Sequence, residues 1–293
     1  MCDQSMKVTM HTPDVDDLGD AVRSLREWQY DAKTVPLHPG DLGWRWTTGA
    51  EATAAAVRTW SRDGRILAVG LLDGPGVLRL AIAPAAQDDD ELAQQMTADI
   101  TQVDRGVLPE GEVAVEARDA AVLGGLLSDE GWAPGEQWTP LARDLAEPVG
   151  DPGVRIELVG PDRVAAHTAV HRSAFDSARF TDERWHAMAD GLPYADARSL
   201  LAYDAHGDAV AAVTVWSAGR GRPGLLEPMG VHPDHRGHGY GRAICVAAAA
   251  ALRDMGSSSA TVCTRAANGG GVATYESAGY RRLPDVPDLV RSA

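Results

Sequence analysis

A short run rich in glycine, histidine and arginine, "HPDHRGHGYGRA" at residues 232–243, contains the residue types that hold an anion. It follows the apolar run "GLLEPMGV" at 224–231 and precedes an alanine-rich stretch that is expected to be a helix over 241–255. Glycine permits left-handed backbone and close approach of a ligand, and the amide groups at a helix amino terminus attract negative charge. The pattern therefore predicts a phosphate-binding turn between a strand and a helix, which we term the phosphate turn.

Spacing separates three kinds of phosphate-binding loop. The nucleoside triphosphatase loop needs lysine and then serine or threonine after its last glycine, whereas Gly241 is followed by arginine and alanine. The dinucleotide fingerprint G-x-G-x-x-G does not fit either, because Gly237, Gly239 and Gly241 are spaced by two throughout. The third pattern, Q/R-x-x-G-x-G/A, is satisfied by Arg236, Gly239 and Gly241.

This third pattern resembles the pyrophosphate loop of the GNAT superfamily of acyl-CoA N-acyltransferases. A second stretch, "NGGGVATYESAGYRRL", lies downstream in the expected order. It is similar to the second motif of that family, in which an asparagine precedes a tyrosine and a glycine–aromatic pair closes the helix. Asn268, Tyr275 and the pair Gly279 and Tyr280 occupy those positions. The resemblance covers residues 154–293.

The resemblance implies how acetyl-CoA is bound as the donor. A bulge is expected to splay the strand at 224–231 from "SATVCT", so that pantetheine adds to the main chain like an extra strand. The main-chain contacts implied for it are Met229, Gly230 and Val231, and Asn268 helps to hold the same arm. The pyrophosphate is expected to meet the phosphate turn through Arg236, Gly237, His238, Gly239, Tyr240, Gly241 and Arg242.

Two side chains are candidates for the proton transfers. Tyr275 is placed by the resemblance to protonate the departing CoA thiolate, although an aromatic residue there also suits a core. Glu227 is the candidate base for the acceptor ammonium, acting directly or through a water, or serving only as its anchor. In "TDERW", Asp182 and Glu183 could recognise a cationic acceptor, but acids in a first helical turn favour a capping role.

The elements that must position these residues occur twice along the chain. Pro148 to Gly153 form a turn-rich boundary between two similar orders of strands and helices. The expected fold class is α/β (α+β), with two tandem GNAT-like domains at residues 1–150 and 151–293. Each is expected to have a mixed, mostly antiparallel sheet flanked by helices, and the carboxy-terminal domain a splayed parallel strand pair. In the first half the pattern predicts helices over 15–30, 50–60 and 88–103, a loop over 34–46 and a hairpin over 64–84.

The first half is expected to keep the fold without the donor site. Its counterpart of the phosphate turn carries Asp88, Asp89, Asp90 and Glu91, whose charges repel a pyrophosphate and suit the first turn of a helix. We therefore expect residues 1–150 to be a degenerate domain. The loop "PLHPGDLGWRW" either reaches across to the other half or anchors its own core through its tryptophans.

Composition narrows the partners further. The net charge of -15 disfavours nucleic acid and suits a cationic acceptor. No apolar run reaches the length of a membrane span, and the amino terminus shows no secretory pattern, so a cytoplasmic location is expected. Cys2, Cys245 and Cys263 form no CxxC pair, and the three histidines of the phosphate turn fit a solvated loop better than a metal site, so no metal is expected.

The sequence thus predicts an acetyl-CoA-dependent N-acetyltransferase. The acceptor is expected to be a primary amine of a small cationic molecule, attacked directly in a ternary complex by a monomer or homodimer. The alternative is a non-catalytic acyl-CoA sensor that kept the phosphate turn and lost turnover.

Overall fold

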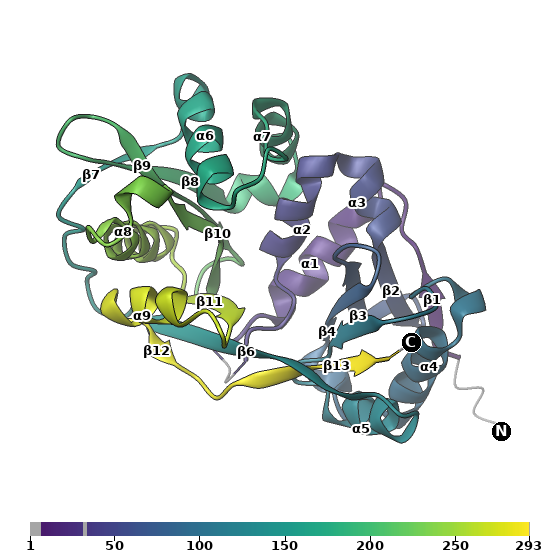
Figure 1. Ribbon diagram of the computed structural model, residues 1–293. Coiled ribbons are helices and arrows are strands. Elements are labelled where there is room, and N and C mark those ends of the chain that lie inside the picture. Colours follow the sequence, from purple (N-terminus) through teal and green to yellow (C-terminus); the bar gives the residue numbers. More distant parts are fainter. Residues whose placement is uncertain (1–6, 32–33, 293) are drawn as a thin grey trace.

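The computed structural model describes residues 7–31 and 34–292, so Cys2 lies outside the described residues. Two halves lie side by side, and the long strands β6 and β13 run between them (Figure 1). The first half contains β1 (Thr9–His11), α1 (Leu18–Trp28), α2 (Pro39–Arg45), α3 (Ala50–Ala56), β2 (Val57–Arg62), β3 (Arg65–Leu72), β4 (Val77–Ile82), α4 (Asp90–Thr101), β5 (Val113–Glu116), α5 (Ala121–Asp129) and β6 (Ala133–Asp144).

The second half has a similar order, with two helices instead of three after its first strand and one additional short strand near its end. It contains β7 (Arg155–Leu158), α6 (Val164–Ala174), α7 (Asp182–Ala189), β8 (Ala197–Tyr203), β9 (Ala209–Ser217), β10 (Gly224–Val231), α8 (Tyr240–Asp254), β11 (Ser259–Arg265), α9 (Gly269–Ser277), β12 (Arg281–Arg282) and β13 (Val286–Arg291). The mixed α/β fold class is therefore confirmed. In each half one parallel pair interrupts the antiparallel pairing, β4 with β5 and β10 with β11.

The strands form one continuous sheet in the order β1-β2-β3-β4-β5-β13-β6-β11-β10-β9-β8-β7. The last long strand of each half pairs with a strand of the other half. β6 pairs with β11 from Ser259 to Arg265, while β13 pairs with β5 from Leu289 to Arg291. We propose that residues 1–150 and 151–293 are the two repeats of the chain, with these strands exchanged between them.

Two local predictions in the first half were wrong. Residues 39–45 form helix α2 instead of a loop, because the His38 ring accepts the Gly40 N–H at 2.9 Å and the Asp41 carboxylate accepts the His38 N–H at 2.6 Å. Pro39 occupies the first helical position, where its missing N–H costs nothing. The helix expected over 50–60 ends at Ala56, and β-branched Val57 begins strand β2.

Helix α2 carries much of the contact between the halves. It packs on the buried Trp216 of β9, and its Gly40 and Gly43 allow that approach. A Cβ at Gly43 would lie 2.2 Å from Cζ3 of Trp216, and one at Gly40 would lie 2.5 Å from its Cγ. The indole therefore sits directly against the helix backbone, and this contact joins the first half to the second in addition to the paired strands.

Replacing Gly43 with alanine is expected to destabilise the protein, because a methyl group there overpacks the buried indole. We expect the thermal midpoint to fall by about 2–6 °C. The matched control is Gly19→Ala in α1, where an added Cβ meets nothing within 4 Å and should leave the midpoint unchanged or higher. Equal midpoints for Gly43→Ala and the parent protein in differential scanning calorimetry would contradict this description of the interface.

Within the described residues, no helix combines the length and the apolar character needed to cross a membrane.

Candidate active site

The phosphate turn has the backbone geometry of an anion site. It leaves the carboxyl end of β10 and enters α8, as the sequence predicts. Gly237 and Gly239 have φ of +80° and +85°, the left-handed conformation that favours glycine. A Cβ at either position would meet nothing within 4 Å, so the space beside the turn is open to a ligand.

The amide groups of the turn lie at the amino-terminal end of α8. The first donor inside the helix is Ala243 N–H, bonded to the Gly239 carbonyl at 3.0 Å. Arg236 N–H, on the other side of the turn, bonds the Pro233 carbonyl at 3.2 Å. The amides between these two, including those of His238 and Tyr240, occupy the helix end that attracts an anion.

Both arginines of the turn also brace it against neighbouring helices. Arg236 donates to the carbonyl of Ala174 at the end of α6 (2.8 Å), and Arg242 donates to the carbonyl of Ser277 at the end of α9 (3.1 Å). Gly241 allows α8 and α9 to approach, because a Cβ there would lie 2.8 Å from Cγ2 of Thr274. The arginines thus place positive charge at the turn while they fix its position.

Strands β10 and β11 separate beside the turn. They pair only at Gly224 with Ala260 and at Leu225 with Thr261, although both strands continue. On its other edge β10 has a bulge between Leu226 and Met229 and then pairs with β9 as far as Val231. This is the predicted splayed strand pair. It leaves one edge of Met229, Gly230 and Val231 facing the gap between the strands.

Glu227 lies in the bulge of β10 and is half-buried. Its main-chain carbonyl accepts the Trp216 indole N–H at 2.6 Å, which fixes the backbone of the bulge. Burial raises the pKa of the Glu227 carboxyl to about 7, with Arg79 opposing the shift and Asp41 adding to it. None of the ion pairs formed among the described residues includes Glu227, so its carboxylate is free to meet a ligand.

Tyr275 is on α9 and is 7% exposed, with its ring edge-on to Tyr280 at a centroid distance of 5.9 Å. Burial raises its pKa well above the usual 10, and nearby Cys245 and Glu227 raise it further, so the hydroxyl stays protonated. Asn268 caps the same helix. Its Oδ1 accepts the Gly271 N–H at 3.1 Å, and its Nδ2 donates to Thr264 at 3.0 Å. The carboxylate and the phenol therefore come from different elements, β10 and α9.

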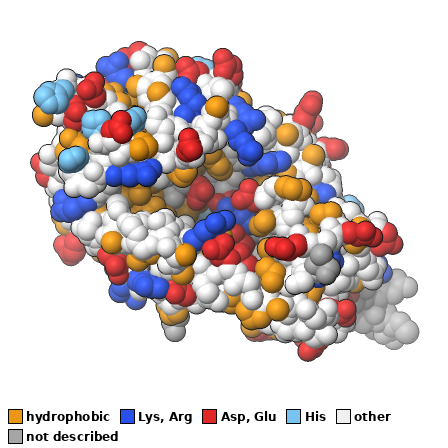
Figure 2. Space-filling model, viewed as in Figure 1, with side chains coloured by type: hydrophobic (Ala, Val, Ile, Leu, Met, Phe, Trp, Pro, Cys, Tyr) orange, Lys and Arg blue, Asp and Glu red, His pale blue; other side chains and the backbone are white. Residues whose placement is uncertain are grey.

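A pocket of about 380 Å³, which we term the central pocket, lies between the two halves. Asp41, Asp73 and Arg79 of the first half line it, and Glu227 and Pro228 of β10 line it from the second half. Figure 2 shows this hollow between the halves, with acidic side chains on its floor and basic ones on the wall above. The bulge of β10 is thus exposed to the central pocket while the same strand borders the gap toward β11.

Residues 166–280 match the model of the acetyltransferase (GNAT) family. The chain therefore contains a GNAT-family domain at these residues. They span the phosphate turn, the splayed strands, Glu227 and Tyr275. A search of curated proteins finds no significant match to the sequence.

Solved structures of the same fold extend over both halves. A tandem GNAT protein from the clavulanic acid biosynthesis pathway is 16% identical, with a TM-score of 0.60 over 97% of this chain and 98% of that one. A GCN5-related N-acetyltransferase from Sphaerobacter thermophilus is 18% identical, with a TM-score of 0.58 over 97% and 95%. A GNAT-family acetyltransferase from Colwellia psychrerythraea is 14% identical, with a TM-score of 0.59 over 97% and 98%. At these identities the likeness concerns the fold.

Sequence reasoning missed the ion network beside the GNAT domain. Arg79 of β4 contacts Asp41 at 2.8 Å and Glu116 of β5 at 3.1 Å, and Arg118 also contacts Glu116 at 3.1 Å. Asp73 is more distant, at 3.8 Å from Arg79. A signal was present in the sequence, because Arg79 interrupts an apolar strand and Glu116 ends one.

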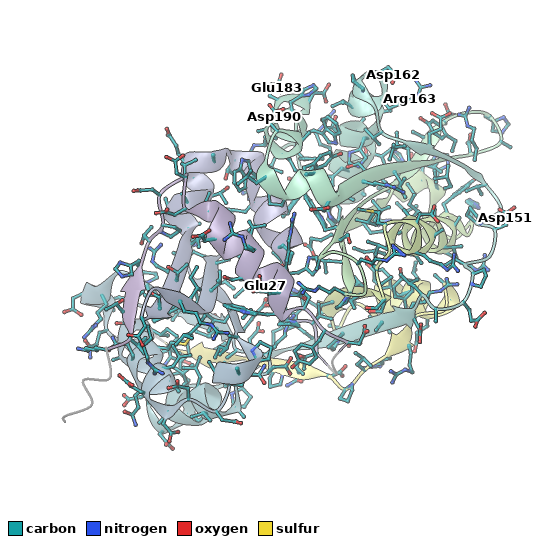
Figure 3. All side chains as sticks on the ribbon, turned by 180° about the vertical axis from the view of Figure 1, so that it is seen from behind. Glu27, Asp151, Asp162, Arg163, Glu183 and Asp190 are labelled. Atoms are coloured by element: carbon teal, nitrogen blue, oxygen red, sulfur yellow. The ribbon has the colours of Figure 1, made fainter. Side chains whose placement is uncertain are left out.

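Other charged residues lie away from the central pocket. Asp182 accepts a hydrogen bond from Thr168, and Glu183 is on the outer surface of α7, as Figure 3 shows from behind. Asp89 of the first half caps α4 by accepting the Leu92 N–H at 2.9 Å. The portion of the chain that the structure describes contains no group of three or more histidine, cysteine or acidic side chains arranged for a metal ion.

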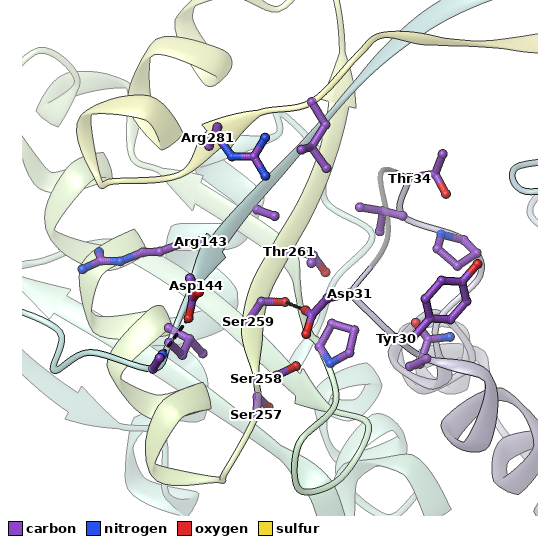
Figure 4. A pocket seen from close by; sticks show the side chains of 18 of the residues that line it. Tyr30, Asp31, Thr34, Arg143, Asp144, Ser257, Ser258, Ser259, Thr261 and Arg281 are labelled. Carbon is purple, nitrogen blue, oxygen red and sulfur yellow. Dashed lines mark hydrogen bonds between the residues drawn. The ribbon is translucent and has the colours of Figure 1, made fainter.

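A larger cavity, of about 850 Å³, lies at the amino-terminal ends of β10 and β11, opposite the phosphate turn. Figure 4 shows its walls, which include Asp31, Arg143, Ser259 and Arg281. The Ser259 hydroxyl donates to Asp31 at 2.6 Å across the two halves. None of the site residues predicted from the sequence lines this cavity, whereas Glu227 lines the smaller central pocket.

Proposed function

We propose that this protein is an N-acetyltransferase that transfers the acetyl group of acetyl-CoA to the primary amine of a small molecule. The observation that carries the proposal is the position of Glu227. It lies in the bulge of β10, between the gap that would take the pantetheine arm and the pocket that would take the amine.

The donor would be bound along β10 and the phosphate turn. The pyrophosphate would accept hydrogen bonds from the amides of Gly237 to Arg242, and pantetheine would pair with the free edge of Met229, Gly230 and Val231. Asn268, as the cap of α9, would border the same gap. This arrangement would direct the thioester toward Glu227.

The reaction needs three proton transfers. Glu227 would take a proton from the acceptor ammonium, and the neutral nitrogen would attack the thioester carbonyl to form the new C–N bond. The C–S bond then breaks, Tyr275 would protonate the departing thiolate, and the resulting tyrosinate would take the remaining extra proton from the new amide nitrogen, while the proton on Glu227 passes to solvent. A base with a pKa of about 7 is matched to neutral pH, because it is both ionised in part and able to accept a proton.

The first half would contribute to the acceptor site and not to the donor site. Asp41 and Arg79 lie beside Glu227, whereas Asp89 is engaged as a helix cap and in an ion pair with Arg62 at 2.7 Å. We propose that the first half closes the central pocket over the bulge of β10.

Tyr275→Phe tests the role of the phenol. Because the ring is retained, the core packing should persist and acetyl-CoA should bind within about threefold of the parent. Loss of the general acid should lower kcat about 100-fold. The measurement is steady-state CoA release beside calorimetric titration with acetyl-CoA. An unchanged kcat would make Tyr275 a core aromatic only.

The proposal itself is tested by mass spectrometry of amines incubated with the protein and acetyl-CoA. Small monoamines, diamines, amino acids and aminoglycosides sample the acceptor classes. Formation of an N-acetylated product that depends on the protein is the expected result. Tight acetyl-CoA binding without any acetylated amine would instead favour a non-catalytic acyl-CoA sensor.

A further inference from the structure

The central pocket carries both signs of charge in separate places. Its acids surround Arg79, which pairs with Asp41 at 2.8 Å. The pocket is also lined by Arg45 at the end of α2, Arg179 just before α7 and Arg184 within α7. Among the described residues, none of these three arginines lies within 4.0 Å of a carboxylate.

The three arginines thus form a cationic side of a pocket in an acidic protein. Arg179 and Arg184 are exposed, and Arg45 is half-buried. The Nε of Arg45 is buried and makes no hydrogen bond to any described residue. A buried donor without an acceptor is costly, so a ligand oxygen at this position would be stabilising. Guanidinium groups match the oxygens of carboxylate and phosphate, to which they donate in pairs.

An aromatic wall also lines the central pocket. Trp44 and Phe180 lie 4.9 Å apart between ring centroids, and His171 lies 4.6 Å from Phe180 and 4.6 Å from Phe175. Burial lowers the pKa of His171 to about 4, so its ring is neutral at physiological pH and adds no charge to the wall. The wall suits an apolar body between the two polar ends of a ligand.

We propose that the acceptor amine also carries an oxyanion, a carboxylate or a phosphate, together with an apolar body. This inference rests on the proposed acetyl transfer. The ammonium end lies at Glu227, the oxyanion at Arg45, Arg179 and Arg184, and the body against the aromatic wall. A pocket of about 380 Å³ is near the lower end of the range of small-molecule sites, which is about 300–1,000 Å³.

Matched acceptors test this assignment. The carboxylate arm compares phenylalanine with its primary amide and with phenethylamine, and the phosphate arm compares O-phosphoethanolamine with ethanolamine. We expect the oxyanion-bearing member of at least one arm to have the higher kcat/KM by at least tenfold. The arm that shows this preference identifies the oxyanion. If kcat/KM for the neutral members equals or exceeds that for the oxyanion-bearing members in both arms, the inference is overturned.

Variants of the exposed arginines supply the second measurement. Arg179→Gln and Arg184→Gln should each raise KM for the oxyanion-bearing acceptor about tenfold and leave KM for its neutral counterpart unchanged. Arg220→Gln, at an exposed position outside the central pocket, is the control and should change neither. An increase in KM by the same factor for the charged and the neutral acceptor would contradict an oxyanion contact.

Binding distinguishes failure of this inference from failure of the proposed function. If neutral amines are acetylated without any dependence on Arg179 or Arg184, acetyl transfer stands and the inference is overturned. If no amine is acetylated but phenylalanine or O-phosphoethanolamine binds calorimetrically in an arginine-dependent way, the pocket assignment stands and acetyl transfer fails. If no amine is acetylated and neither acceptor binds, both the proposed function and the pocket assignment are overturned.

Discussion

Replacing Glu227 with glutamine should lower kcat/KM at pH 8 by roughly 100-fold to 1,000-fold, the usual contribution of a general base. Glutamine keeps the size of the side chain and its place in the bulge of β10, but it cannot accept the ammonium proton. Acetyl-CoA binding should persist, since no step of donor binding uses this carboxylate. The control is Glu183→Gln on the outer surface of α7, which should have the parent activity.

The pH profile separates a base from an anchor. With a pKa of about 7, Glu227 loses its proton as the pH rises, so kcat/KM of the parent protein should rise through that value. In Glu227→Gln this rise of kcat/KM near pH 7, the acid limb of the profile, should disappear. If the variant kept the limb near pH 7 and only KM increased, Glu227 would anchor the amine and another group would take its proton.

The same carboxyl makes stability depend on pH. Because its pKa is higher in the folded protein than the usual 4.5, the folded state binds more protons between these values. The free energy of unfolding therefore falls as the pH rises from about 4.5 to 7. Glutamine does not ionise, so it loses no stability as the pH rises. Glu227→Gln should therefore melt at a higher temperature than the parent at pH 8, and the difference should shrink below pH 5. A difference that is the same at pH 5 and pH 8 would contradict this.

Gly239→Asp should weaken acetyl-CoA binding by about 100-fold or more. The residue has φ of +85° and an open space beside it, so the added carboxylate would stand where the pyrophosphate is expected. Two negative groups that share one anion site repel each other strongly. Calorimetric titration with acetyl-CoA measures the loss, and Gly239→Ala, which changes conformation without charge, should weaken binding much less.

The control for this variant is its counterpart in the first half. Asp89→Ala removes the cap of α4 and its ion pair with Arg62, which should cost about 1 kcal/mol of stability. It should leave the Kd for acetyl-CoA within about twofold. A large loss of acetyl-CoA binding in Asp89→Ala would contradict the view that only the second half holds the donor.

Much of the donor side could be predicted from the sequence because it depends on local chemistry. The glycines of the phosphate turn fix backbone conformations, and the alanine-rich run fixes α8, so strand, turn and helix follow from one continuous segment. A bulge in the strand at 224–231 was predicted from the family resemblance, and the structure has one between Leu226 and Met229.

The acceptor side could not be predicted because it depends on contacts between segments far apart in the sequence. Gly40 and Gly43 read as loop residues, yet they allow α2 to pack on Trp216. Arg79 and Glu227 line the same pocket only because the halves face each other there. Strand β13 was not predicted, because "VPDLVR" contains a proline and an aspartate and gains its pairing from β5 and β6.

In the proposed reaction, acetyl passes from CoA to an amine in the pocket between the halves. The most direct test of this transfer is the rate of CoA thiol release at saturating acetyl-CoA as the concentration of an amine is raised. The structure predicts a rate that rises with the amine, saturates, and is lost in Glu227→Gln. Calorimetric binding of acetyl-CoA combined with a release rate that no amine increases would contradict it.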